Sequence, residues 1–454
     1  MNRFTKNDTM ILKGVAILFL FLHHGWQSTE VTFFVSGIDL VSNLQSFAKI
    51  CVAIFVILSG YGLYCSYERQ QISNIKQTIQ FVSVHIIKIF LTFWLVFILA
   101  ALFIGIITGN FQTVYAGHPF YYVLMDGMGI SYFTGSPKFV NSWWYISATL
   151  LYYVCFPILY AVIKKLKRLN WILLPLFTVI LLLNDGINTV IIYFAFFVFG
   201  MIFAERKIFI EQAAAKRSGT QKLYIRIPVY IALFLLVTII RQIYLDEMLS
   251  YYVLDWILVL IMMMFLADIR VENMAVFKPL IFLGKYSFEM FLIHAVFIRY
   301  FVGFIYYTEN LLGIFIRVTV VSVLAAMGIV LIKKIIHFQR MYQFCCQPNH
   351  CKKIFAGIAI VIFLLFVPEV IANIGFGNLE LKETEVYMEE EKYRQIEYSQ
   401  TPVFWDFANK KYTSDNSQIA VCANDFIFSH EKGSTEVTIS IPGGKKVNLI
   451  VNVE

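Results

Sequence analysis

Charged residues are scarce in this chain of 454 residues. Only 15% of the residues are charged, whereas 59% are hydrophobic, and the mean hydropathy is +0.71. Such a composition excludes an ordinary soluble globular protein. Apolar runs of roughly 20 residues, the length that crosses a bilayer as a helix, recur along most of the chain. The sequence therefore predicts an all-α polytopic membrane protein that resides in a lipid bilayer.

Cysteine pairs, internal repeats and a cleavable leader are lacking as well. Of the seven cysteines, Cys422 stands alone outside the membrane, which excludes a disulfide framework. The thiols and the histidine of segment 345–351 fit no usual zinc spacing, so no metal site is expected. No repeat of about 20–50 residues is evident, which disfavours repeat-built transporter folds. Lys13 interrupts the first apolar run and no cleavage site follows, so we do not expect a signal peptide.

The apolar runs give eleven candidate spans. They lie near residues 9–28, 46–66, 84–108, 143–163, 171–185, 188–204, 227–244, 250–268, 282–306, 312–334 and 354–374. The fifth and sixth are short and hinged at Asn184, Asp185 and Gly186. The prediction is therefore a bundle of about 10–11 transmembrane helices, where a helix spans with roughly 20 residues.

Lysine and arginine crowd one set of loops. Clusters such as 164–168 and 333–340 fall on this side, while the other side holds Lys49, Lys138 and Arg241 as its main exceptions. By the positive-inside rule the N-terminus is cytoplasmic, and the odd span count puts the C-terminus outside. The net charge of +8 is then a signature of topology and not of nucleic-acid binding. We expect a multi-pass protein of the plasma membrane.

The chain changes character after its last apolar run. We divide it into a transmembrane domain, 1–375, and an extracytoplasmic polar tail, 376–454. Strand-like alternation at 435–441 and 446–453, joined by a Pro-Gly-Gly turn, predicts a β-hairpin. Glu389, Glu390 and Glu391 lie in a stretch of helical composition. The tail is expected to be too short for a large core of its own.

Two kinds of ionisable residue lie in the first span. Lys13 and His24 are three helical turns apart, roughly 16 Å, and share nearly one face of the helix. Ionisable groups inside a span are costly and default to a functional hypothesis. His23 and His24 diverge by about 100° around the helix, so one of them is expected to be a structural hydrogen-bonder.

Four segments together resemble the acyltransferase-3 family of integral membrane O-acyltransferases. The family's Arg/Lys, ten residues, His pattern falls on Lys13 and His24. Its "FFxxSGY" helix and "LGxxSxxxYLxH" element are similar to segments 55–61 and 283–294, and Ser142 to Tyr145 lies between them. Each motif alone is weak, but four in the same order are specific and cover about residues 5–335.

This resemblance implies a transfer reaction. An acyl group, usually acetyl, would pass from cytoplasmic acyl-CoA to a hydroxyl of an extracytoplasmic glycan or glycolipid, such as a cell-envelope polysaccharide. Acyl-CoA is then a donor substrate, and no permanently bound cofactor is expected. His24 suits the general base, or a transient acyl carrier, since imidazole titrates near neutral pH. Lys13 and Lys88 would hold the coenzyme's phosphates.

The remaining candidates are weaker. His294 is expected to face the bundle interior, and Glu289 to orient a histidine or to neutralise a cation. Ser59, Tyr61 and Trp144 would contact substrate, although the Ser59 to Gly62 run also suits close helix packing. A separate outer segment around Asp126, rich in aromatic residues, is a possible sugar-contact surface.

Two departures from the family pattern leave alternatives open. Where the family has "RxxRIxP", this chain has His85, Lys88 and Leu91, and lysine keeps the charge but loses the bidentate phosphate grip. The tail carries no Gly-Asp-Ser block of an SGNH hydrolase.

A glycan transporter or exporter without transferase activity is the main alternative. A sensor or substrate-delivery module is a third.

Overall fold

A computed structural model of the chain describes residues 4–27, 33–35, 38–108, 114–115, 119–134, 136–182, 189–209, 219–243, 254–269, 275–308, 310–373, 378–401, 410–423, 426–440 and 446–454. The chain is 74% helical and ends in a region that is partly β-strand. The prediction of an α-helical membrane protein with a partly β tail is confirmed.

Seven helices among the described residues are long and apolar enough to cross a membrane. They are Lys6–Trp26, Leu40–Arg69, Ile75–Gly105, Asn141–Ile180, Ile225–Gln242, Leu311–Ile335 and Pro348–Val367. A bent pair, Ala275–Lys285 and Ser287–Tyr300, makes an eighth span if its halves are counted together. Thr189–Glu205 is a shorter apolar helix.

The long helices are fewer than the eleven predicted spans, and the run Asn141–Ile180 accounts for part of the difference. It contains α8 (Trp144–Leu166), the 3-10 turns of η2 (Lys167–Ile172) and most of α9 (Leu173–Leu182), and Lys167 at the junction has a φ of 46°. α8 and α9 run in opposite directions along α10 (Thr189–Glu205), because Tyr152 and Lys164 contact Val190 and Glu205, whereas Trp171 and Phe177 contact Arg206 and Phe199. The charged residues at 164–168 therefore mark a turn between two helices.

Contacts group the chain into two compact units. One comprises Met1–Ile107 with Val140–Lys352, and the other Thr108–Phe139 with Lys353–Glu454. The division at residue 375 was drawn from composition alone, and it stays a prediction.

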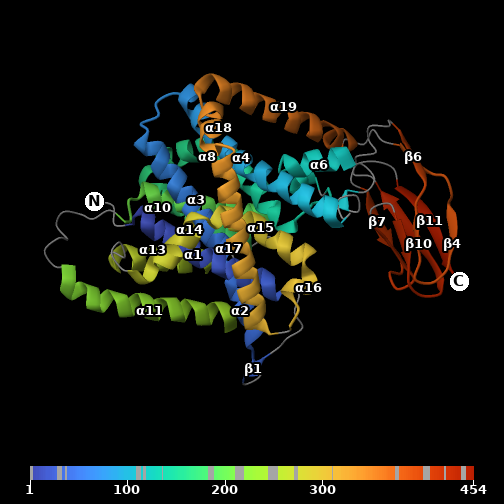
Figure 1. Ribbon diagram of the computed structural model, residues 1–454, viewed down its shortest axis with the longest axis horizontal. Coiled ribbons are helices and arrows are strands. Elements are labelled where there is room, and N and C mark those ends of the chain that lie inside the picture. The colour runs from blue at the N-terminus through green and yellow to red at the C-terminus, as the bar shows by residue number, and fades with distance from the viewer. Residues whose placement is uncertain are drawn as a thin grey trace. The chain divides into compact units, whose positions relative to one another are not determined.

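Helix α1 (Lys6–Trp26) is central to the first unit. Its start is fixed by a capping box, in which the Asp8 N–H donates to Thr5 Oγ1 at 3.3 Å and the Thr5 N–H donates to Asp8 Oδ2 at 2.7 Å. The helix packs against α3 (Ile50–Arg69), α14 (Lys278–Lys285), α15 (Ser287–Tyr300) and α17 (Leu311–Ile335) (Figure 1). Residues from distant parts of the sequence therefore meet along α1.

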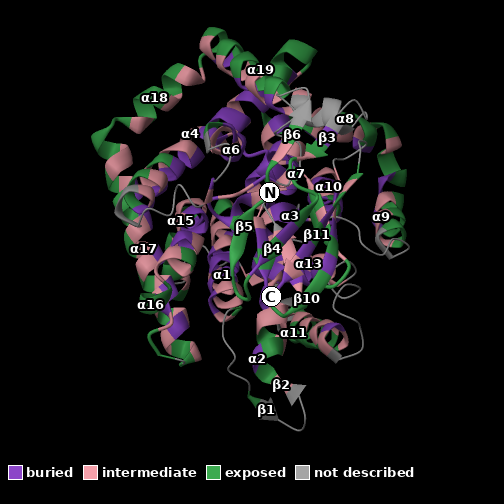
Figure 2. Ribbon diagram, turned by 90° about the vertical axis from the view of Figure 1, so that its right-hand side faces the viewer, coloured by how far each residue is buried: buried purple, intermediate pink, exposed green. Residues whose placement is uncertain are grey.

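The helices of this unit differ in how deeply they are buried (Figure 2). In the most apolar window of Leu40–Arg69, 61% of residues are buried, against 6% in Ile225–Gln242. The first run contributes to the interior of the bundle, and the second presents an apolar surface of the kind that faces lipid.

Glycines let two helix pairs approach with backbones in contact. A Cβ placed on Gly60 of α3 would lie 2.1 Å from the Phe197 carbonyl oxygen of α10 (Thr189–Glu205), and one on Gly200 would lie 2.1 Å from the Ile57 carbonyl oxygen. Gly14 and Gly284 form the same kind of reciprocal contact between α1 and α14. Small residues permit such close packing of transmembrane helices.

The strands of the tail form several small sheets. The largest has the order β4-β11-β10-β7, with Glu385–Met388, Lys446–Val453, Gly433–Ser440 and Lys411–Ser414 as its strands. β10 and β11 pair antiparallel from Gly433 with Val453 to Ser440 with Lys446, which confirms the predicted hairpin. The smaller sheets contain β3 (Asn378–Leu381) with β6 (Tyr398–Thr401), and β5 (Tyr393–Gln395) with β9 (Phe426–Ser429) and β8 (Ala420–Ala423).

One expectation for the tail is wrong. The stretch around Glu389 to Glu391 is not helical, because β4 ends at Met388 and Glu391 turns the chain with a φ of 55°.

The tail has a hydrophobic core, built by strand pairing between distant segments. Its buried side chains are Leu379, Val386, Met388, Ile396, Ala420, Ile427, Val437, Ile439, Leu449, Val451 and Val453.

Candidate functional site

Two histidines that are 270 positions apart in the chain meet between α1 and α15. His24 Nδ1 lies 2.8 Å from His294 Nε2, and the two rings are nearly parallel, with an interplanar angle of 17°. His294 is fully buried, whereas His24 keeps part of its surface exposed. We call this pair the histidine dyad.

His23 points to a different element. Its Nδ1 lies 2.9 Å from the Gln45 carbonyl oxygen of α2 (Leu40–Ala48), an atom that can only accept a hydrogen bond. The Nδ1–H of His23 therefore donates to the backbone. The structure thus gives His23 a structural partner and leaves the dyad to His24.

Aromatic side chains pack beside the dyad and fix the position of α15. The Phe21 and Phe291 rings lie 5.7 and 6.1 Å from the His294 ring. Trp143 Nε1 donates to the Leu292 carbonyl oxygen at 3.0 Å, so the start of α8 is tied to the turn that carries His294. This packing fixes the position of the buried member of the dyad.

Three predicted contact residues lie in packing roles. Ser59 Oγ is 3.1 Å from the hydroxyl of Tyr153, a phenol and thus no base at neutral pH. Tyr61 packs edge-on against Phe4, and Trp144 stacks on Tyr193 with ring centroids 6.0 Å apart. These contacts favour the packing interpretation of the Ser59 to Gly62 run.

Lysines lie at the other end of the predicted site, where the phosphates of acyl-CoA are expected to bind. Lys13 of α1 interacts electrostatically with Lys88 of α4 (Ile75–Thr108). Thr92 follows Lys88 by one helical turn on the same face, and its hydroxyl lies 3.2 Å from Lys333 Nζ. Lys333 in turn forms an ion pair with Glu289 at 2.7 Å.

We call Lys13, Lys88, Lys333 and Glu289 the cationic cluster. Three ammonium groups against one carboxylate leave a formal excess of two positive charges. The repulsion between Lys13 and Lys88 would be relieved by an anion bound beside them, so the cluster suits a multiply charged anionic ligand.

The structure places Lys333 beside the predicted site residues and favours the second of the two roles predicted for Glu289, the neutralisation of a cation. The sequence assigned Lys333 only to the basic rim of an inner loop, and no local signal links it to Glu289, 44 positions earlier. Glu289 neutralises a lysine and is not hydrogen-bonded to the dyad. His85, which stands where the family has an arginine, donates from Nδ1 to the Phe81 carbonyl oxygen of its own helix at 2.8 Å.

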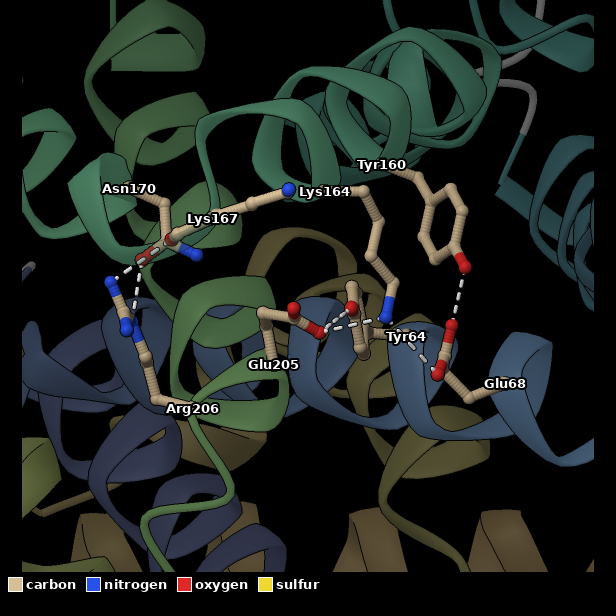
Figure 3. Close-up of polar contacts among 8 residues, drawn as sticks. All are labelled: Tyr64, Glu68, Tyr160, Lys164, Lys167, Asn170, Glu205 and Arg206. Carbon is tan, nitrogen blue, oxygen red and sulfur yellow. Dashed lines mark hydrogen bonds and ion pairs between the residues drawn. The ribbon is translucent and has the colours of Figure 1, made fainter.

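A second polar cluster, which the sequence did not indicate, joins the C-terminal ends of α3, α8 and α10 (Figure 3). Lys164 Nζ lies between the carboxylates of Glu68, at 3.3 Å, and Glu205, at 3.0 Å. Tyr64 donates to Glu205 and Tyr160 donates to Glu68. The side chains come from the last turns of three helices, and their contacts hold the C-terminal ends of those helices together.

Asp126 is unavailable for the sugar contact that the sequence suggested. It is buried in the second unit and accepts hydrogen bonds from the Tyr115 hydroxyl at 2.7 Å, the Ser131 hydroxyl at 3.0 Å and the Phe139 N–H at 2.7 Å. Burial raises the pKa of this carboxyl, although the three donors oppose the shift. His118, which the sequence places in the same outer segment as Asp126, lies outside the described residues.

Within the described ranges, no group of three or more His, Cys, Asp or Glu side chains is placed to hold a metal ion. The comparisons with known proteins give one family. A family model described as an acyltransferase domain matches residues 10–332, a range that includes Lys13, His24, Lys88 and His294. No curated protein and no solved structure matches the chain.

Proposed function

The chain belongs to the acyltransferase-3 family, and from this we propose that it moves an acyl group, acetyl by default, from cytoplasmic acyl-CoA to a hydroxyl of an extracytoplasmic glycan. Membership makes it a membrane acyltransferase. The donor, the acceptor and their sides of the membrane are our proposal.

One observation carries the proposal: a single helix joins the cationic cluster to the histidine dyad. Lys13 belongs to the cationic cluster and His24 to the histidine dyad, and both lie on α1, eleven residues apart. The offset is about 16 Å along the axis. Acyl-CoA also separates its phosphates from its thioester by a long flexible arm, so the two regions match the two ends of the donor.

The chemistry follows from these positions. The imidazole of His24 removes the proton of the acceptor hydroxyl as that oxygen attacks the thioester carbonyl carbon. The carbon–sulfur bond then breaks, and the thiolate of coenzyme A leaves and takes up the proton from His24. The products are an acyl ester and free coenzyme A, and the imidazole returns to its neutral state.

The test uses purified full-length protein in liposomes, radiolabelled acetyl-CoA and a panel of cell-envelope glycans. We expect label to move to a glycan, and His24→Ala to lower the rate about 10²–10⁴-fold, the usual contribution of a general base. His23→Ala is the matched control, because His23 bonds only to the Gln45 carbonyl among the contacts described for its ring nitrogens.

Wild-type transfer by the His24→Ala protein would remove His24 from the reaction. Failure of the purified wild-type protein to transfer label to any glycan, while it moves a glycan across the liposome membrane, would favour an exporter instead.

A further inference from the structure

We propose that His294 is a positioning residue, which fixes the tautomer of His24 so that the lone pair lies on His24 Nε2. The inference rests on the proposed role of His24 as the base, and it concerns how that base is prepared. It follows from two consecutive hydrogen bonds.

The first hydrogen bond settles where His294 carries its proton. His294 Nδ1 lies 2.7 Å from the carbonyl oxygen of Phe291, one turn earlier on α15. A carbonyl oxygen only accepts, so Nδ1 must be the protonated nitrogen. In a neutral imidazole the other nitrogen, Nε2, then carries the lone pair.

Burial favours the neutral form of His294. The side chain is fully buried, and within the described residues the groups that interact with it include the carbonyls of Met290 and Phe291 but no carboxylate. A buried imidazolium without a counter-ion is costly. His294 Nε2 is therefore an acceptor.

The second hydrogen bond determines which ring nitrogen of His24 carries the proton. His24 Nδ1 lies 2.8 Å from His294 Nε2, and because Nε2 accepts, Nδ1 of His24 must donate. The proton of neutral His24 then resides on Nδ1, and its lone pair on Nε2. The near-parallel rings, 17° apart, place the shared hydrogen close to both ring planes.

The neighbouring histidine does not compete for this role. His23 also lies against the His24 ring, with centroids 5.2 Å apart, but its Nδ1–H is committed to the Gln45 carbonyl. His294 is thus the residue that holds His24 Nδ1, and it is itself held by the backbone of its own helix.

The arrangement performs the task of the carboxylate in a Ser-His-Asp triad without placing a negative charge in the bundle. An orienting partner keeps the base in the correct tautomer and stabilises the imidazolium that forms when the base takes a proton. Here the partner is a neutral imidazole, whose lone pair faces the Nδ1–H of His24. The resting dyad carries no net charge, which suits a bilayer.

Two amide substitutions test the inference because they separate the two nitrogens of His294. In His294→Gln the longer amide reaches the former Nε2 position, so its oxygen can accept from His24. In His294→Asn the shorter amide reaches only the former Nδ1 position, where it can still donate to the Phe291 carbonyl. Both variants keep a polar side chain in the same buried place.

We expect His294→Asn to lower kcat about 10²–10⁴-fold with the KM for acetyl-CoA within about threefold of wild type, as for loss of an orienting residue. His294→Gln should retain kcat within about tenfold, since it restores the acceptor. Nitrogen-15 NMR of labelled histidine should report His24 protonated on Nδ1 in the wild type and in His294→Gln, and a mixture of tautomers in His294→Asn.

Equal activity of the Asn and Gln variants, or a His24 proton on Nε2 in the wild-type spectrum, would overturn the role of His294. If His24→Ala is inactive in the same assay, the proposed function survives that result. A fully active His24→Ala protein would instead refute the proposed role of His24 as the base, and the NMR result would still decide the tautomer.

Discussion

At the scale of single residues, Glu289 and Lys333 set the charge of the cationic cluster. They form an ion pair at 2.7 Å, and their side chains keep exposures of only 14% and 16%. Because Glu289 offsets one lysine, its removal and the removal of Lys333 must change the field of the cluster in opposite directions.

These opposite effects on the charge of the cluster predict opposite changes in the KM for the acyl-CoA donor. Lys333→Met should raise the KM for acetyl-CoA about tenfold or more, since a hydrogen bond to a charged group contributes about 1.5–3 kcal/mol. Glu289→Gln should lower that KM, and both effects should shrink as salt screens the charges. Steady-state kinetics at two ionic strengths measures them. Lys334→Met, at the exposed neighbouring position, is the control.

A different result would favour the other role that the sequence suggested for Glu289, the orientation of a histidine. If Glu289→Gln lowers kcat about a hundredfold and leaves KM unchanged, the carboxylate takes part in the chemical step.

The sequence predicts residues better than it predicts their partners. Lys13 and His24 stand out because their spacing is local and their presence in a span is costly. The bond between His24 and His294 joins positions 270 apart, and the bond between Lys333 and Glu289 joins positions 44 apart. A single sequence contains no periodicity that reports such contacts, so the dyad and Lys333's place in the cluster required the fold.

At the scale of helices, the glycine contacts between α3 and α10 decide how closely the bundle packs. Gly60 faces the Phe197 carbonyl of α10, whereas Gly62, two residues later on α3, has no neighbour within 4 Å of an added Cβ. The same short motif therefore contains one position that packing requires and one that it does not.

A matched pair of alanine substitutions tests this difference. Gly60→Ala should cost about 1–3 kcal/mol or more of folding stability, because the atom it meets is rigid backbone. Gly62→Ala should be neutral or stabilise by up to about 1 kcal/mol, the difference in helix propensity. Thermal unfolding in detergent compares them, and equal melting temperatures would show that the helices can separate without cost.

Elements with local signals were predicted well, and elements defined by distant pairing were not. The sequence of the β10 and β11 hairpin carries alternating apolar residues and a Pro-Gly-Gly signal between the strands. β5 and β9 are short strands that pair Tyr393 with Phe428, and β3 and β6 pair Asn378 with Thr401. Strands of three or four residues give too short an alternation to identify, and their partners are set by the packed sheet.

At the scale of the whole molecule, the distribution of lysine and arginine predicts an orientation in the membrane. We propose that the N-terminus and the basic loops are cytoplasmic and that the tail is outside the cell. The helix α19 (Pro348–Asn373) would then be the span that carries the chain outward before the first strand.

Reporter fusions measure this orientation. Alkaline phosphatase, which is active only outside the cytoplasm, should be active when fused after Glu454 and inactive when fused after Gln347, before α19. A green fluorescent protein at the same two positions should show the reverse. Phosphatase activity at both positions, or at Gln347 alone, would contradict the orientation.

The strand order of the largest sheet also constrains when the tail can fold. β11 lies between β4 and β10, and it pairs parallel with β4, whose residues precede it by about 60 positions. The ribosome therefore makes the edge of the sheet long before its centre. Until residues 446–453 have been synthesised, β4 lacks its partner and the apolar strands are open to chaperones and proteases. A premature stop codon that removes only β11 would leave the sheet without its middle.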